Sequence, residues 1–344
     1  MYCLREAKRD DGEALLKLAR HLDTVNLPAE PARLERIIDR SVRSFTGEIE
    51  PAEREYLFAL ENVETGEVVG TSMIHAQHGS RRAPHVYFQL IADERYSESL
   101  DRYFVHQCLR IGYNYDGPTE IGGLILLPDY RGRPSGLGKL LSYARFLYIA
   151  MHREVFRDQV ISELLPPLEP DGTSVLWEHL GKKFTGLTYQ EADLLSKDNK
   201  EFIRSLFPHD LIYVALLPDE VADVIGQVGP HTRGVESMLR RIGFEFANQI
   251  DPFDGGPHFI AATDEISLIK SARPIRSEAV GSADNGRPWA IVGAHGKSGF
   301  RATYTRVIPE QGGALGDSES IGLSPDTLAA LGVKAGDPVW IAEP

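Results

Sequence analysis

The stretch from residue 119 to residue 156 constrains the fold of this chain most. TEIGGLILL (119–127) is a short apolar run, and this pattern predicts a buried strand. RGRPSGLG (131–138) follows with three glycines, and KLLSYARFLYIAMHREVF (139–156) then predicts a long helix. A strand, a glycine-rich loop and a helix in this order are typical of layered α/β proteins.

The glycine-rich loop has the spacing R-x-x-G-x-G. Glycines let the backbone come close to an oxyanion, and a helix start offers free N–H groups and the positive end of the helix dipole. Basic residues also gather here, in a chain that is acidic as a whole. We therefore predict a diphosphate-binding loop made of Arg131, Gly132, Arg133, Gly136, Gly138 and Lys139. The alternative is an arginine-rich surface loop with a glycine at the helix start.

Two common nucleotide-binding motifs do not match this loop. A P-loop has Ser or Thr after its lysine, whereas Leu140 follows Lys139. The dinucleotide fingerprint G-x-G-x-x-G does not occur here either.

Elsewhere, predicted strands alternate with predicted helices, which favours an α/β sheet. Residues 31–45 predict a helix opened by a proline, and two β-rich runs flank the turn ETGE (64–67) as in a hairpin. Residues 158–165 predict another strand. The segments 177–189 and 238–250 both read as helix, glycine and strand. This likeness is either a common glycine helix cap or a weak internal duplication.

The composition changes after residue 272. The next thirty residues are rich in Gly, Ser and Pro, and residues 324–342 predict a short helix followed by β runs. We expect one large domain over residues 1–272 and a small β-rich C-terminal domain over residues 273–344.

Charge and cysteine content exclude several classes of protein. The chain carries 37 Lys and Arg against 50 Asp and Glu, a net charge of −13, which argues against nucleic-acid binding. No apolar run is long enough to span a bilayer, and the charged start MYCLREAKRDD does not resemble a secretory signal. Only Cys3 and Cys108 are present. We expect a cytoplasmic protein without nucleic-acid or membrane partners.

Several strings of this sequence resemble a known family. The loop is similar to the acyl-CoA motif of GNAT N-acyltransferases, and nearly the whole chain resembles the arginine N-succinyltransferase family. The strings that carry this resemblance are SFTGEI (44–49), LPDYR (127–131), LLSYARFLYIA (140–150), ADLLS (192–196), VIGQV (224–228), IGFEF (242–246), DPFDGGP (251–257) and LGVKAGD (331–337). The resemblance implies a GNAT-like mixed sheet flanked by helices.

The resemblance also implies a reaction. A free α-amine attacks the thioester of an acyl-CoA directly in a ternary complex, with no tightly bound cofactor. The expected co-substrate is succinyl-CoA, and the expected acceptor is arginine or ornithine. Backbone N–H groups of residues 121–127 would polarise the thioester carbonyl. Leu124 and Leu126 would contact CoA, although simple core packing would also explain them.

Two departures from the family bear on this expectation. The family's proton-donor histidine corresponds to Gly229 here, and His231 lies two residues further on as a candidate replacement. A family arginine corresponds to Leu165. Because a succinyl carboxylate favours an arginine partner, an acetyl donor stays open as an alternative.

Acidic residues are the other candidates for chemistry. Glu120 matches a family acid and could act as a base through water, or merely cap a strand edge. Glu163, a second catalytic candidate, ends a predicted strand near the expected entry of the amine, where it could also bind the substrate guanidinium. Asp251 and Asp254 could bind a substrate guanidinium, or could belong to a tight structural turn.

No metal site is predicted. His75, His78 and His85 lie close in sequence but without a cysteine or an acidic cluster beside them.

The family contains paired subunits. We therefore expect a homodimer or a hetero-oligomer with a paralogous subunit. A chain without the usual histidine could also be a weakly active or regulatory partner.

Overall fold

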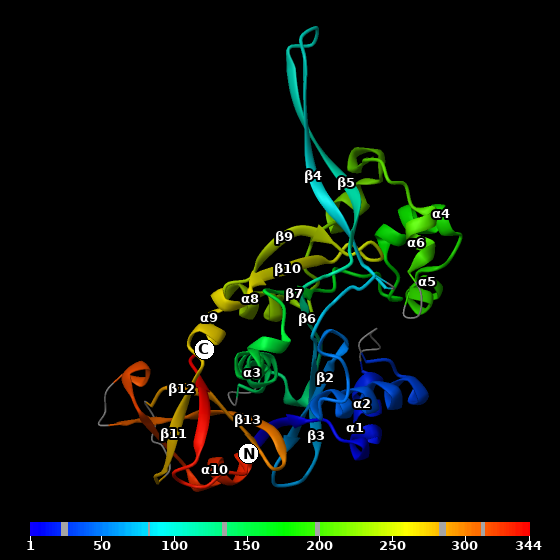
Figure 1. The fold of residues 1–344 in the computed structure, drawn as a ribbon. Helices are drawn as coiled ribbons and strands as arrows, with labels where there is room; N and C mark the ends of the chain where they lie inside the picture. The colour runs from blue at the N-terminus through cyan, green and yellow to red at the C-terminus, as the bar shows by residue number, and fades with distance from the viewer. Residues whose placement is uncertain (22–26, 82, 133–135, 197–199, 282–286, 311–313) are drawn as a thin grey trace. The chain divides into compact units, whose positions relative to one another are not determined.

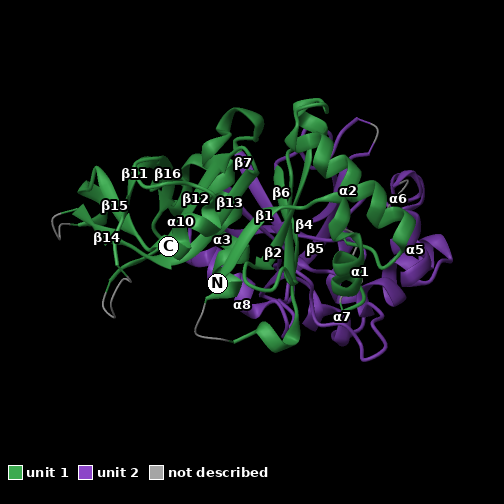
Figure 2. Cartoon of the chain, turned by 90° about the horizontal axis from the view of Figure 1, so that it is seen from below, with its two compact units in different colours: residues 1–76, 119–158, 262–344 green, residues 77–118, 159–261 purple. Residues whose placement is uncertain are grey.

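The computed structural model describes residues 1–21, 27–81, 83–132, 136–196, 200–281, 287–310 and 314–344. The chain divides into two compact units, coloured green and purple in Figure 2. Unit 1 comprises residues 1–76, 119–158 and 262–344, and unit 2 comprises residues 77–118 and 159–261. Among the described residues, no helix combines the length and the apolar character that a membrane span requires.

Unit 1 is built on a mixed sheet. In order across the sheet, its strands are β14 (Ile308–Pro309), β15 (Ser320–Leu323), β11 (Arg273–Ala279), β16 (Pro338–Ala342), β12 (Trp289–Gly296), β13 (Gly299–Arg306), β1 (Tyr2–Glu6), β2 (Glu55–Asn62), β3 (Val68–His75) and β6 (Thr119–Leu126). Strands β11 and β15 pair in parallel, and β1 pairs antiparallel with both β2 and β13. The C-terminal region is β-rich, as predicted, and its strands continue the N-terminal sheet through the pairing of β13 with β1.

Helices cover both faces of the β2–β3–β6 part of this sheet. Figure 1 shows α1 (Gly12–Ala19) and α2 (Pro31–Phe45) on one side and α3 (Leu137–Met151) on the other. Short helices α9 (Ser267–Lys270) and α10 (Pro325–Leu331) complete the unit. Helix α3 is buried over most of its length, and Tyr148 on this helix packs edge-on against Phe58 and Phe300 from two strands. The predicted α/β class, helix 31–45 and ETGE hairpin are confirmed.

Unit 2 has its own strands. In order they are β7 (Gln159–Glu163), β10 (Pro257–Ala262), β9 (Glu245–Ile250), β4 (His85–Ser97), β5 (Arg102–Asn114) and β8 (Ile212–Tyr213). Strands β4 and β5 pair in continuous register as a long hairpin (Figure 1), which the sequence analysis does not assign.

The helices of unit 2 are α4 (Lys182–Thr185), α5 (Tyr189–Ser196), α6 (Glu201–Leu206), α7 (Asp219–Val224) and α8 (Arg233–Arg241). Buried residues of α5, α6 and α7 share one apolar core with the base of this hairpin. Trp177 is fully buried and stacks on Phe253 with ring centroids 5.0 Å apart, and Phe88 belongs to the same core.

The two similar segments diverge after their glycines. Gly243 leads from α8 into β9, as predicted. Gly186 has φ +72° and ends α4, but the chain then enters helix α5 instead of the expected strand. The likeness of the two segments is therefore limited to a helix and its glycine. Within residues 211–217, Ile212–Tyr213 form a short strand and a 3₁₀ turn follows.

Candidate active site

The predicted diphosphate loop connects β6 to α3 in unit 1. Strand β6 ends at Leu126, a 3₁₀ turn covers Pro128–Tyr130, and α3 begins at Leu137. Gly132 and Gly136 both have φ +66°, a left-handed conformation that favours glycine. Arg133 lies outside the described residues.

Two glycines at the start of α3 differ in their surroundings. Gly136 is the N-cap residue, and a Cβ atom there would lie 2.6 Å from the ring of Tyr304. A Cβ atom on Gly138 would meet nothing within 4 Å. The first helical hydrogen bond runs from the N–H of Leu140 to the carbonyl of Gly136. The N–H groups of residues 137–139 therefore lack acceptors within the helix, as an anion-binding helix start requires.

The basic residues of the loop differ in their surroundings. Lys139 Nζ lies 5.7 Å from the centroid of the Tyr304 ring, close enough for a cation–π contact. Arg131 is exposed, and its Nε donates to the carbonyl of Leu126 at 2.8 Å. Arg131 therefore lies at the β6 end of the loop, and Lys139 lies at its α3 end.

Strand β6 carries a bulge just before the loop. Thr71 pairs with Ile125 and Met73 with Gly122, so Ser72 faces two residues of β6, Gly123 and Leu124. Gly123 has φ +57°. Bulges interrupt the hydrogen-bond ladder and are frequent beside active sites.

The bulge also affects the two predicted CoA-contacting leucines. Leu124 and Leu126 are half-buried, whereas Ile125 between them is buried. Both the CoA contact and partial core packing fit this placement.

A buried guanidinium lies beneath this strand. Arg145 on α3 is 2% exposed and donates to the carbonyl of Gly122 at 3.3 Å and to the carbonyl and hydroxyl oxygens of Ser142. Burial lowers the pKa of Arg145 to about 9. Within the described part of the chain, no carboxylate forms an ion pair with it. The sequence analysis missed this residue, because an arginine within an apolar helix shows no partner in the sequence.

Glu120 is buried in unit 1 and faces a histidine. It is 5% exposed and pairs across the sheet with His75 of β3, which in turn pairs with Glu55 of β2. His75 Nδ1 lies 3.9 Å from Glu55 Oε1. The predicted base therefore lies in a row of titratable groups across three strands.

A cavity of about 380 Å³ lies beside the start of α3. Leu137 and Leu140 line one side of it. Trp289 and Tyr304 line another side and stack at a centroid distance of 4.7 Å, with the guanidinium of Arg306 5.1 Å from the Trp289 ring. The C-terminal region thus contributes aromatic and cationic side chains next to the glycine loop.

In unit 2, Glu163 lies among three histidines. Its Oε1 atom is 3.1 Å from Nε2 of His85, 3.5 Å from Nε2 of His258 and 3.6 Å from Nε2 of His78. Burial by itself would raise the pKa of Glu163, but the neighbouring imidazoles, that of His258 first, outweigh it and hold the pKa well below the usual range. Glu163 is therefore ionised.

The sequence predicts no metal site, because no acidic residue lies near His78 and His85 in the sequence. In the structure, a carboxylate does lie beside them. The acid that seemed to be missing beside His78 and His85 is Glu163, which comes from β7 nearly eighty residues later. His258 comes from β10 and was not considered at all. No spacing signal could have found the cluster, because its members lie on separate strands.

Asp251 and Asp254 form a buried pair in the turn between β9 and β10. Asp251 Oδ1 accepts the N–H of Phe253 at 2.7 Å, and Asp254 Oδ1 accepts the N–H of Gly256 at 2.7 Å. Burial, reinforced by the charge of Glu163, raises the pKa of Asp251 to about 7. Burial and the neighbouring Asp251 raise the pKa of Asp254 well above its usual value. The pair thus shapes the turn, and the charge of Lys200 offsets only part of the effect of burial on the pKa of Asp251.

The candidate His231 lies on an exposed turn before α8. The neighbouring Gly229 is buried, and its N–H donates to the carbonyl of Leu165 at 2.9 Å. A Cβ atom on Gly229 would lie 2.5 Å from the carbonyl oxygen of Pro166. The backbone as it stands therefore has no room for a histidine at position 229, and the role of His231 stays a prediction.

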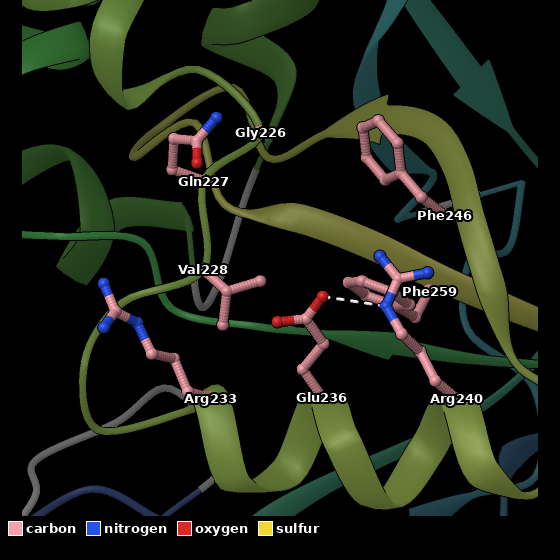
Figure 3. A pocket seen from close by; sticks show the side chains of 8 residues that line it. All are labelled: Gly226, Gln227, Val228, Arg233, Glu236, Arg240, Phe246 and Phe259. Carbon is pink, nitrogen blue, oxygen red and sulfur yellow. Dashed lines mark hydrogen bonds and ion pairs between the residues drawn. The ribbon is translucent and has the colours of Figure 1, made fainter.

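A second cavity, of about 390 Å³, lies in unit 2 (Figure 3). Residues of the VIGQV string line it together with side chains of α8. Glu236 accepts a hydrogen bond from Arg240, whose guanidinium lies 4.7 Å from the centroid of the Phe259 ring. The predicted catalytic and substrate residues are not among those that line this cavity.

Comparison with known proteins decides the family. A family model described as the arginine N-succinyltransferase beta subunit matches residues 2–268, and the model of its C-terminal domain matches residues 273–343. The chain belongs to the arginine N-succinyltransferase family. The first family model ends at residue 268, and the second begins at residue 273.

Individual members of this family are similar over almost their whole length. An arginine N-succinyltransferase from Escherichia coli is 32% identical over 342 residues, covering 98% of this chain and 96% of the relative. One from Shigella boydii is 33% identical with the same coverage. The solved structure of arginine/ornithine succinyltransferase subunit AI from Pseudomonas aeruginosa has a TM-score of 0.84 and 30% identity, covering 100% of this chain and 98% of that one.

Proposed function

We propose that this chain transfers a succinyl group from succinyl-CoA to the α-amine of arginine or ornithine, by direct attack in a ternary complex. The observation that carries the proposal is the start of α3, with Gly136 as N-cap and open space at Gly138, in a chain that belongs to the arginine N-succinyltransferase family. Diphosphate would bind the N–H groups of residues 137–139, with Lys139 beside them.

The bulged strand supports the placement of the thioester. An interrupted ladder at Gly123 and Leu124 frees backbone polar groups, which can polarise a thioester carbonyl. Leu124 and Leu126 are accessible enough to contact the pantetheine arm.

Arg145 supports a succinyl donor. A buried guanidinium without a paired carboxylate gains most from a substrate carboxylate, because charge-assisted bonds are strong where water is excluded. We assign the succinyl carboxylate to Arg145, which would compensate for the family arginine missing at Leu165.

Asp251 and Asp254 are the proposed partners of a cationic substrate. Asp251 and Asp254 are buried together, and a guanidinium or ammonium group would offset the cost of ionising them. Glu120 is the proposed base, and His231 the proposed donor of a proton to the departing thiolate. Glu163 stays a second candidate for the base, and its carboxylate lies 3.1 Å from His85 Nε2.

A thiol-release assay across acyl-CoAs and amino acids tests the proposal. Thiol should appear only when a basic amino acid accompanies succinyl-CoA. Faster turnover with acetyl-CoA would favour the alternative donor that Leu165 and Gly229 suggest. Activity that appears only with a paralogous subunit would favour the hetero-oligomer. A cytoplasmic location and a homodimeric or hetero-oligomeric state stay predictions.

A further inference from the structure

We infer that unit 2 contains a site for a divalent transition-metal ion of the zinc class, with His78, His85 and Glu163 as ligands. This inference goes beyond acyl transfer. It rests on three side chains that come from a loop, the start of β4 and the end of β7. Each offers one ligand atom, and these three atoms lie within 4.8 Å of one another.

The two distances from Glu163 to the histidines fit tetrahedral coordination. Metal–nitrogen and metal–oxygen bonds of about 2.0–2.1 Å place two ligand atoms of a tetrahedral ion about 3.3–3.5 Å apart. Glu163 Oε1 lies 3.1 Å from His85 Nε2 and 3.6 Å from His78 Nε2. Two imidazoles and one carboxylate form the donor set of many zinc sites that keep a fourth position open.

The burial of His85 also suits a metal. His85 is 2% exposed, and within the described part of the chain neither of its ring nitrogens forms a hydrogen bond of good geometry, although Nε2 lies 3.1 Å from Glu163 Oε1. A buried polar atom without a partner is costly, and a metal ion held by both side chains would remove that cost.

The backbone holds the two histidines together. The N–H of His78 donates to the carbonyl of Pro118 at 2.7 Å. A Cβ atom on Gly117 would lie 1.8 Å from the carbonyl oxygen of His78, and one on Gly79 would lie 2.8 Å from the backbone nitrogen of His85. These two glycines therefore permit the close approach that brings the imidazole centroids of His78 and His85 to 4.5 Å.

His258 and Asp251 belong to the surroundings of this site. His258 is fully buried on β10, and its Nε2 lies 3.5 Å from Glu163 Oε1, so it can orient the ligating carboxylate. A second grouping of Glu163, Asp251 and His258 is also compact. It is the poorer donor set, because Asp251 has a pKa raised to about 7 and already accepts the N–H of Phe253.

Metal binding to the full-length chain tests the inference. The protein is stripped with a chelator, and ZnCl₂ is titrated by calorimetry, with Co²⁺ as a spectroscopic substitute. Wild type should bind one Zn²⁺ per chain, and Co²⁺ should give the strong visible bands of tetrahedral coordination. His78→Ala and His85→Gln should each weaken Zn²⁺ binding by more than the about 10–100-fold that loss of an outer-shell partner causes.

An exposed histidine of the same unit provides the control. His209→Ala should bind Zn²⁺ as wild type does. Circular dichroism checks folding, and His78→Ala, on a half-buried loop position, decides the result if His85→Gln does not fold. Absence of stoichiometric binding, wild-type affinity in the His78 variant, or equal loss in His209→Ala would overturn the inference. Because the readout is metal binding, failure leaves the proposed acyl transfer untouched.

Discussion

The guanidinium of Arg145 on α3 donates to the carbonyl of Gly122 on β6, directly beside the bulge at Gly123 and Leu124. This contact joins the helix that follows the glycine loop to the strand that precedes it. It places a fixed positive charge under the segment that we assign to the thioester. A charge in this position has a direct consequence for the choice of acyl donor.

Arg145→Met should separate the donors. Loss of a charge-assisted contact costs about 1.5–3 kcal/mol, so kcat/KM for succinyl-CoA should fall about 10–100-fold. Turnover of acetyl-CoA, which has no second carboxylate, should change much less. Steady-state kinetics of one preparation with both donors provide the internal control. An equal fall for both donors would assign Arg145 to packing alone.

Gly138→Leu tests the loop. Its Cβ faces open space, so a leucine there should leave the fold intact while it blocks the approach of diphosphate to the helix start. Calorimetry should show weaker CoA binding by at least about tenfold, the loss of one to two hydrogen bonds to a charged group. Gly234→Leu, at another open position near a helix start, is the matched control and should bind CoA normally. Unchanged CoA affinity in Gly138→Leu would remove the loop from the site.

Glu120→Gln tests the proposed base. The amide keeps the size of the side chain but cannot accept a proton, so kcat should fall about 10²–10⁴-fold while CoA affinity is retained. His231→Ala serves as the comparison for the second proton-transfer group. If only the His231 variant loses turnover, the base has to be sought near that exposed turn and away from β6.

The pH dependence of arginine binding follows from Asp251. Its pKa is raised to about 7, so the carboxyl is mainly neutral below that pH and ionised above it. A cationic substrate prefers the ionised form, so the dissociation constant of arginine should fall as pH rises from about 6 to 8. Asp251→Asn should bind arginine weakly with a flat profile over this range. Calorimetric titrations of both proteins check this, and parallel profiles would exclude Asp251 from the substrate site.

Local patterns in the sequence predict much of unit 1. Proline at position 31 and the apolar spacing after it fix α2, and the ETGE turn fixes the β2–β3 hairpin. Gly132 and Gly136 adopt the left-handed backbone conformation that favours glycine, and this is a local property that a sequence pattern can indicate. The β4–β5 hairpin was missed. Its outer half carries exposed residues on both faces, so it lacks the alternation that marks a strand.

The candidate sites were harder to predict for a different reason. Glu163 was singled out, but the partners of its carboxylate come from residues 78, 85 and 258. Only the pairing of strands distant in the sequence brings these imidazoles together. Arg145 likewise donates to the carbonyl of Gly122 on another element, and the sequence of the helix alone does not reveal this contact.

A crystal structure of the chain soaked with coenzyme A tests the central claim most directly. The account predicts diphosphate oxygens within hydrogen-bonding distance of the backbone N–H groups of residues 137–139, with the pantetheine arm along the bulged end of β6. Diphosphate bound at another place, with the loop before α3 empty, would contradict it.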